Sequence, residues 1–167
     1  VVGACSFATE RVPDNGVVGG GACEGDKTKN SLTHKHYAEQ AEKFGTNGRS
    51  SISDINIRNL EINALLRYLE DGKKVLEIGC GNGYSAVKIL EQRNIDLIAM
   101  DASEELIKLA KEQIIANARG RVKFRAGNAL HANFQGELFD AVFTERCLIN
   151  ITNWEDQKAA LAEIAGV

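Results

Sequence analysis

Several features that would assign this sequence to a particular class of protein are absent. No apolar run approaches the roughly 18 residues that a membrane helix needs. The four cysteines form no CxxC pair, and no histidine lies at the spacing of a zinc site. The N-terminus shows no basic stretch followed by an apolar one, as a secretory signal would. We therefore expect a cytoplasmic protein that holds no metal ion and does not act on a membrane.

A strong charge of either sign is also absent. The formal net charge is −3 over 167 residues, which disfavours a protein that binds nucleic acid mainly through electrostatic attraction. Apolar residues make up 44 % and charged residues 26 % of the chain, which is the composition of a globular protein. This balance excludes a largely disordered chain and predicts one domain with a single core.

The first 30 residues differ in composition from the rest. They contain six glycines and the only proline, Pro13, and they show no helical period. We predict a glycine-rich N-terminal arm over residues 1–30 without regular structure, followed by a globular domain over residues 31–167.

Strands and helices alternate within the predicted domain. The apolar patterns predict strands over 74–78, 96–100, 122–125 and 138–144. They predict helices over 36–44, 52–69, 84–92, 104–118 and 154–165, the last two capped by Ser103 and Asn153. This alternation is typical of a parallel sheet covered by helices on both faces, an α/β fold.

A glycine-rich turn follows the first predicted strand. Gly79, Gly81 and Gly83 stand between that strand and the next helix. Glycine lets the backbone turn tightly and approach a ligand closely. We expect the amides of this turn and of the helix start to face the ligand.

Asp101 ends the second strand, 22 residues after Gly79. The carboxyl ends of neighbouring strands in a doubly wound sheet share one crevice, where an acid can accept both hydroxyls of a ribose. Two cofactor classes fit. A nicotinamide dinucleotide would need GxGxxG, which fails at Tyr84 when counted from Gly79. The shifted segment 81–86 fits GxGxxA but begins three residues after the strand. The other class is a nucleoside cofactor without a pyrophosphate.

The segment Glu77-Ile-Gly-Cys-Gly-Asn-Gly83, with Asp101 at the end of the next strand, resembles the first motif of the class I S-adenosylmethionine-dependent methyltransferases. Segment 127–130 and the Phe139-Asp140 pair that opens the fourth strand follow in that family's order, so the resemblance covers residues 34–167. It implies a Rossmann-like, three-layer α/β sandwich with a parallel doubly wound sheet, in the strand order third, second, first, fourth.

The resemblance also implies a role for each matching residue. The glycines would line the amino-acid end and ribose of S-adenosyl-L-methionine, Glu77 would orient their turn, and Asp101 would hold the ribose hydroxyls. Asn128 would bind the adenine. The full implied set of cofactor-binding residues is Glu77, Gly79, Cys80, Gly81, Gly83, Asp101, Ala102, Asn128, Ala129, Leu130, Glu145 and Arg146.

Two of these residues would also contact the acceptor. Glu145 and Arg146 follow the fourth strand and would lie between cofactor and acceptor. The methyl donor is already a strong electrophile, so the protein mainly aligns the acceptor. Glu145 is the candidate base for an acceptor that must lose a proton. Cys147 lacks a histidine partner and is interpreted as a structural cysteine.

The sequence departs from the family at its C-terminal side. The family's sheet usually has seven strands, whereas residue 167 follows the helix after the fourth, so we expect a truncated domain. The fourth strand would then be an edge that needs a cover. Three alternatives are open. A second copy of the chain could cover this edge, the N-terminal arm could fold over it, or the edge could stay uncovered in a partly stable fragment. We expect a homodimer.

The function that the sequence favours is methyl transfer from S-adenosylmethionine to a small-molecule acceptor. Two alternatives stay open. The chain could be a non-catalytic module that binds S-adenosylmethionine or oligomerises, as the early C-terminus would suggest. It could also be an NAD-dependent oxidoreductase, which only the shifted GxGxxA favours.

Overall fold

The computed structural model of the chain describes residues 5–8 (backbone only), 39, 42–43, 45–47, 54–113, 115–132, 134 and 137–166. The strands are β1 (Cys5–Ala8), β2 (Lys74–Ile78), β3 (Asp96–Asp101), β4 (Arg121–Ala126) and β5 (Ala141–Glu145). The helices are α2 (Ile55–Leu65), α3 (Tyr84–Leu90), α4 (Glu104–Glu112), the short 3₁₀ turn η2 (Leu148–Asn150) and α5 (Trp154–Ala165).

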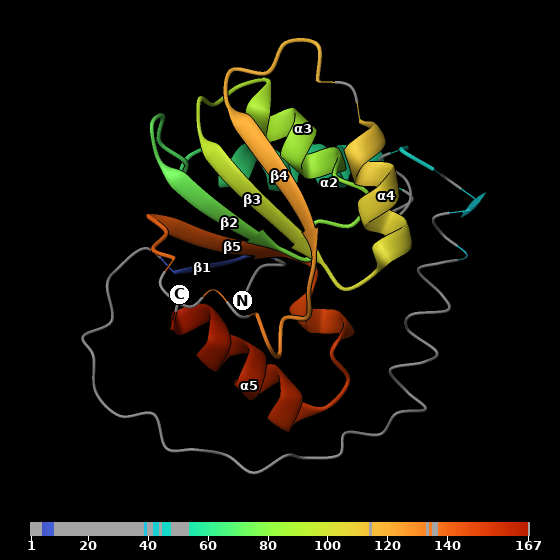
Figure 1. Cartoon of the computed structure of the whole chain (residues 1–167), viewed down its shortest axis with the longest axis vertical. Helices are drawn as coiled ribbons and strands as arrows, with labels where there is room; N and C mark the ends of the chain where they lie inside the picture. The colour runs from blue at the N-terminus through green and yellow to red at the C-terminus, as the bar shows by residue number, and fades with distance from the viewer. Residues whose placement is uncertain are drawn as a thin grey trace.

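The described strands form one sheet in the order β1-β5-β2-β3-β4 (Figure 1). β5, β2, β3 and β4 run parallel, which confirms the predicted order of the four domain strands. Ile78 pairs with Met100 of β3 on one side and with Thr144 of β5 on the other. The carboxyl ends of these three strands therefore lie at one edge of the sheet.

β1 was not predicted. Its residues pair antiparallel with β5, Cys5 opposite Glu145 and Ala8 opposite Val142. The prediction that the arm lacks regular structure is therefore wrong for residues 5–8. β1 also occupies the edge on which the homodimer prediction rested, although dimerisation itself stays a prediction. Of the predicted helix 36–44, only residues 39, 42 and 43 lie within the described part, and all three are helical.

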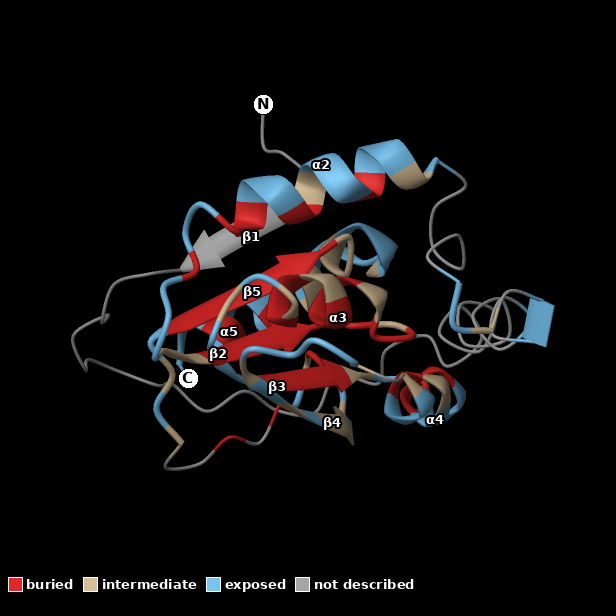
Figure 2. Cartoon of the chain, turned by 90° about the horizontal axis from the view of Figure 1, so that it is seen from above, coloured by how far each residue is buried: buried red, intermediate tan, exposed pale blue. Residues whose placement is uncertain are grey.

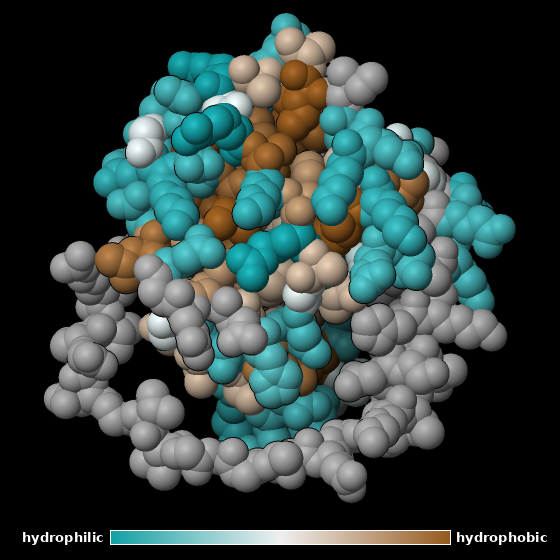
Figure 3. All heavy atoms as spheres, in the orientation of Figure 1, coloured by the Kyte–Doolittle hydropathy of each residue, from teal (hydrophilic) through white to brown (hydrophobic). Residues whose placement is uncertain are grey.

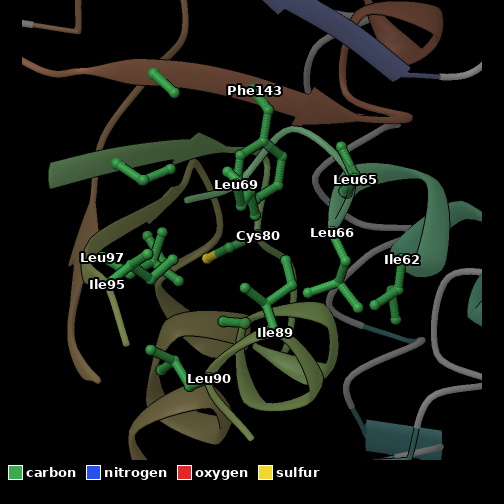
Figure 4. Close-up of a cluster of buried hydrophobic side chains, with 14 of the residues drawn as sticks. Ile62, Leu65, Leu66, Leu69, Cys80, Ile89, Leu90, Ile95, Leu97 and Phe143 are labelled. Carbon is green, nitrogen blue, oxygen red and sulfur yellow. The ribbon is translucent and has the colours of Figure 1, made fainter. Parts of the chain in front are cut away.

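Helices cover both faces of the sheet, as a three-layer sandwich requires. Apolar side chains of α2 and α3 pack with Phe143 and Leu97 on one face (Figure 4), and Ile107 of α4 joins the same cluster. Ala160 and Ile164 of α5 pack on the opposite face against Leu76 and Ile78. The central strands are accordingly buried along their length (Figure 2).

The two helix N-caps that the sequence predicts are present. The Ser103 hydroxyl accepts from the amide of Leu106, and the Asn153 side chain accepts from the amide of Glu155. Four apolar residues at i, i+3, i+4 and i+7 within the predicted helix 52–69 are buried: Ile62, Leu65, Leu66 and Leu69.

Some element boundaries differ from the prediction. α2 is confined to Ile55–Leu65 and continues as a turn. α4 ends at Glu112, because Gln113 turns to an extended conformation with ψ 121°. β5 starts at Ala141 and not at 138, since Leu138 is 73 % exposed and the strand pairing with β2 begins only at Ala141.

Hydrophobic side chains visible from one side form a band over the sheet, flanked by hydrophilic ones (Figure 3). No helix in the described ranges is long and apolar enough to cross a membrane.

Candidate functional site

A pocket opens where β2, β3 and β5 end. Ten of the twelve predicted cofactor-binding residues line it: Gly79, Cys80, Gly81, Asp101, Ala102, Asn128, Ala129, Leu130, Glu145 and Arg146. Glu77 and Gly83 do not reach its surface. Glu77 is buried behind the loop, and Gly83 forms the N-cap of α3. Residues far apart in the sequence thus meet at one edge of the sheet.

The glycine loop, residues 79–83, connects β2 to α3. Gly79, Gly81 and Gly83 have φ values of 85°, 56° and 79°, a backbone region that favours glycine. A Cβ on Gly79 would lie 2.5 Å from the Cβ of Cys147, so glycine is required there for space as well.

The amides of the glycine loop differ from the expectation. The amides of Gly79 and Cys80 both donate to the carbonyl of Met100, at 2.7 and 2.9 Å, and the amide of Gly81 donates to Asp101 Oδ2 at 2.8 Å. The prediction that turn amides face the ligand is therefore wrong for these three. These three amides hold the glycine loop at the end of β3. Because the glycines have no side chains, a ligand can approach the backbone of the loop closely.

Asn82, inside the glycine loop, is completely buried. Its Nδ2 donates to the carbonyls of Gly45 and Asn47, both at 2.9 Å, and Gln113 donates to the carbonyls of Thr46 and of Asn82 itself. The glycine loop therefore anchors residues 45–47, a contact that no motif predicted.

The predicted ribose and adenine residues lie on the β3 and β4 side. Asp101 accepts from Gly81 through Oδ2 and from the Ser103 amide through Oδ1, so its carboxylate is held in a fixed orientation. A carboxylate oxygen can accept more than one hydrogen bond. Asn128 Oδ1 accepts from the amide of Leu130, which shapes the loop that lines the pocket.

Glu77 is the most unusual titratable residue of the site. Its side chain is buried on the face that α2 and α3 cover, and its Oε2 has no hydrogen-bond partner within the described part of the chain. Burial, reinforced by the negative charges of Glu145 and Asp101, raises the pKa of Glu77 to about 8 despite the nearby Arg58. The residue is therefore mostly neutral at pH 7.

Glu145 is held by a buried polar contact between α2, α3 and β5. The Ser85 hydroxyl donates to Glu145 Oε2 at 2.5 Å, and Arg58 donates to the same hydroxyl from Nη2 at 3.3 Å. Burial raises the pKa of Glu145, while Arg58 and the Ser85 hydrogen bond oppose that rise and Glu61 adds to it. Arg58 itself is only 5 % exposed and lines the pocket.

Arg146 adopts φ 60°, the only positive φ of a residue other than glycine within the described ranges. Its guanidinium binds Glu61 of α2 through two contacts, Nε to Oε2 at 3.0 Å and Nη2 to Oε1 at 2.7 Å. Such planar, two-point pairs fix orientation as well as charge. Together, Arg58, Glu61, Glu77, Glu145 and Arg146 form what we call the glutamate cluster.

The sequence interpretation missed about half of the pocket wall. The residues that it did not name as lining are Arg58, Ile78, Ser103, Leu106, Gly127, Cys147, Asn150, Ile151 and Asp156. Arg58 lies on the buried face of α2 together with Ile62 and Leu65. A charged residue on an otherwise apolar helix face is the one sequence feature that could have marked Arg58 as part of the site. Cys147 lines the pocket, but burial raises the pKa of its thiol to about 11, in keeping with a cysteine that is not a nucleophile.

Within the described residues, no group of three or more His, Cys, Asp or Glu side chains could hold a metal ion.

A family model described as "Methyltransferase domain" matches residues 75–167, which is more than half of the chain. The chain belongs to that methyltransferase family. The methyltransferase resemblance stated from the sequence is thereby confirmed.

Curated relatives of this methyltransferase are similar over part of their length. The O-methyltransferase rstn1 of Aspergillus nomiae is 32 % identical over 97 residues, 58 % of this chain and 42 % of the relative. The magnesium-protoporphyrin O-methyltransferase of Rhodobacter capsulatus is 39 % identical over 57 residues, 34 % of this chain and 25 % of the relative. The matched part therefore spans less than half of either relative.

Solved methyltransferase structures share the fold. Magnesium protoporphyrin IX methyltransferase from Synechocystis, with bound S-adenosylmethionine, has a TM-score of 0.65 at 15 % identity and covers 87 % of this chain and 74 % of its own. Phosphoethanolamine N-methyltransferase 2 of Haemonchus contortus has a TM-score of 0.57 at 22 % identity and covers 76 % of this chain and 30 % of its own. These likenesses confirm the Rossmann-like architecture.

The residues of this methyltransferase fit a positively charged nucleoside cofactor. The carboxyl groups of Glu145 and Asp101, which line the pocket, raise the pKa of the buried Glu77, and Arg58 opposes that rise. The Glu77 Oε2 atom is buried and has no hydrogen-bond partner among the residues that the structure describes. The sulfonium of S-adenosylmethionine would add a second positive charge, beside that of Arg58, to this group of acids.

Proposed function

We propose that this chain binds S-adenosylmethionine at the carboxyl ends of β2, β3 and β5 and transfers its methyl group to a small-molecule acceptor. The observation that carries the proposal is the glycine loop with its three positive φ values, tied by the Gly81 amide to Asp101. In a member of the methyltransferase family, this arrangement supports a nucleoside site at that edge of the sheet.

The proposed cofactor contacts divide between backbone and side chains. The carboxylate of Asp101, oriented by Gly81 and Ser103, would accept the two ribose hydroxyls. Asn128 and Leu130 would border the adenine, and Gly79 would let the amino-acid end approach the backbone. When bound, the cofactor supplies an electrophilic methyl group. The protein then has to place an acceptor lone pair in line with that group and keep water away.

Glu145 is the proposed base on the acceptor side. Its carboxylate lines the pocket and is fixed by Ser85, so a nearby hydroxyl acceptor could pass its proton to a group of defined position. Burial raises its pKa, which makes it a better proton acceptor than a surface glutamate. An amine acceptor that is already neutral would not need this step.

The acceptor is proposed only as a small molecule. The curated relatives are named as O-methyltransferases and as N-methyltransferases, so a screen includes both oxygen and nitrogen acceptors. The homodimer and the cytoplasmic location remain predictions, and light scattering on the purified chain tests the former.

The deciding experiment is calorimetry of the folded chain with S-adenosylmethionine, S-adenosylhomocysteine and NAD. We expect micromolar binding of both sulfur nucleosides, none of NAD, and a loss of about 100-fold in Asp101→Ala, because the loop tether and the ribose acceptor disappear together. Glu70→Gln, an exposed residue outside the pocket, is the control. Failure of a folded chain to bind either sulfur nucleoside would overturn the proposal, and binding of NAD alone would favour the oxidoreductase.

A further inference from the structure

Glu77 is placed where a charge entering the pocket must act on it. It lies two residues before Gly79 on β2, and Gly79 lines the pocket. The side chain is 1 % exposed, so no bulk water screens it. Its strand neighbours are apolar, Ala99 on β3 and Phe143 on β5. The electrostatic surroundings of Glu77 are therefore set by a few groups of the protein.

Those groups lie mostly in the pocket wall. Glu145 and Asp101 disfavour ionisation of Glu77, and Arg58 favours it. All three line the pocket. The Cys80 thiol, whose own pKa burial raises, also lies close enough to sense Glu77, and Glu61 acts on Glu145. From α3, Ser85 contributes an uncharged hydroxyl between Arg58 and Glu145.

We propose that Glu77 gives up its proton when the sulfonium-bearing cofactor enters the pocket, so that binding of S-adenosylmethionine, more than that of S-adenosylhomocysteine, is coupled to proton release. A new positive charge favours the ionised form of a nearby acid. The proton leaves the Glu77 carboxyl for the buffer, and the buried Oε2, which has no hydrogen-bond partner within the described part of the chain, becomes part of a carboxylate.

The coupling distinguishes the donor from the product. After methyl transfer the sulfur is neutral, so the charge that favoured ionised Glu77 is gone. A buried carboxylate without a balancing cation is unfavourable, and the site takes its proton back as the product is exchanged. The inference rests on the proposed function, since it requires that the pocket binds this cofactor.

The test measures protons, independently of turnover. Binding of S-adenosylmethionine is followed by calorimetry at pH 7 in phosphate and in Tris, whose ionisation enthalpies differ. The dependence of the measured heat on the buffer gives the number of protons released. The amino group of the ligand titrates too, so the quantity of interest is the wild-type value minus that of Glu77→Gln, a variant that keeps the shape of the neutral acid.

We expect a difference of roughly half to one proton for S-adenosylmethionine and less than half of that for S-adenosylhomocysteine. The affinity for S-adenosylmethionine should rise about tenfold or more between pH 6 and pH 8 in the wild type, beyond any rise in Glu77→Gln. Glu70→Gln, exposed at the end of the α2 turn, should behave as the wild type does.

The possible failures are distinguishable. If the folded chain does not bind S-adenosylmethionine, the proposed function fails. If it binds with no buffer dependence beyond that of Glu77→Gln, or releases as many protons with S-adenosylhomocysteine, the coupling proposal is overturned and the function stands. If Glu77→Gln does not fold, the titration of the labelled Glu77 carboxyl carbon by NMR, with and without ligand, decides. An unchanged titration midpoint in that experiment overturns the coupling.

Discussion

The two sides of the pocket are built by different means. The β3 side is shaped mainly by the backbone, through glycines with positive φ and amides that donate to the carbonyl of Met100. One side chain, the carboxylate of Asp101, holds the glycine loop there. On the β5 side, the glutamate cluster joins side chains from α2, β2 and β5. A backbone site depends on chain geometry and tolerates few changes of shape, whereas a side-chain cluster depends on charge and responds to pH.

The buried acid of the glutamate cluster gives the largest expected effect. Glu77 has a pKa of about 8 in the folded chain against an ordinary 4.5, so its favourable contribution is complete below pH 4.5 and is lost as pH rises towards 8. The loss corresponds to about 5 kcal/mol as an upper limit, at about 1.4 kcal/mol per pH unit. Urea unfolding of the cofactor-free chain at pH 5 and pH 8 measures the larger part of this loss, because Glu77 is only half ionised at pH 8.

Glu77→Gln provides the comparison for that measurement. It cannot ionise, so its stability should change far less between the two pH values than that of the wild type. Equal pH dependence in both proteins would show that another group is responsible.

The glycine loop should be sensitive to shape alone. Gly79→Ala should cost about 3 kcal/mol or more, because the new Cβ would meet Cys147 at 2.5 Å and the φ of 85° is strained for alanine. Gly81→Ala is the matched case: its φ is also positive, but no described residue lies within 4 Å of the new Cβ, so about 1 kcal/mol is expected. Denaturant unfolding at fixed pH compares the two, and equal losses would contradict the steric explanation.

Glu145→Gln tests whether Glu145 acts on the acceptor or on the cofactor. With a hydroxyl acceptor, we expect a fall in kcat of about 100-fold, or roughly 2.7 kcal/mol in the barrier, because a carboxamide cannot take the proton. The affinity for S-adenosylmethionine should change less than tenfold, since the loop and Asp101 are intact. Parallel turnover and calorimetry check this, and a larger loss of affinity than of turnover would assign Glu145 to the cofactor side.

Glu61→Gln should have the smallest effect. It leaves one neutral acceptor for Arg146, and the pair is partly exposed, so a loss of about 1 kcal/mol in stability is expected. The same variant removes a negative charge that raises the pKa of Glu145, so the acid limb of the pH–rate profile should move to lower pH. An unshifted limb would show that Glu61 does not act on Glu145.

The same contrast explains what the sequence could predict. Local patterns sufficed for four strands and for the caps at Ser103 and Asn153, because these depend on periodicity and on capping residues. The order of the strands and the ten pocket residues came from the family resemblance, which the glycines at fixed spacing carry. β1 and the glutamate cluster depend on contacts between distant segments, as when Arg58 meets Glu145 through Ser85, and no local pattern encodes such contacts.

The pairing of β1 with β5 has a consequence for the order of folding. It joins residues separated by about 134 to 140 positions, whereas β2, β3 and β4 follow one another at short intervals along the chain. Closing so long a loop costs more entropy than any other step of sheet assembly, so β1 should add last and detach first. In that interval β5 presents an apolar, unpaired edge to other chains, and the time it stays open sets the tendency of the newly made protein to aggregate.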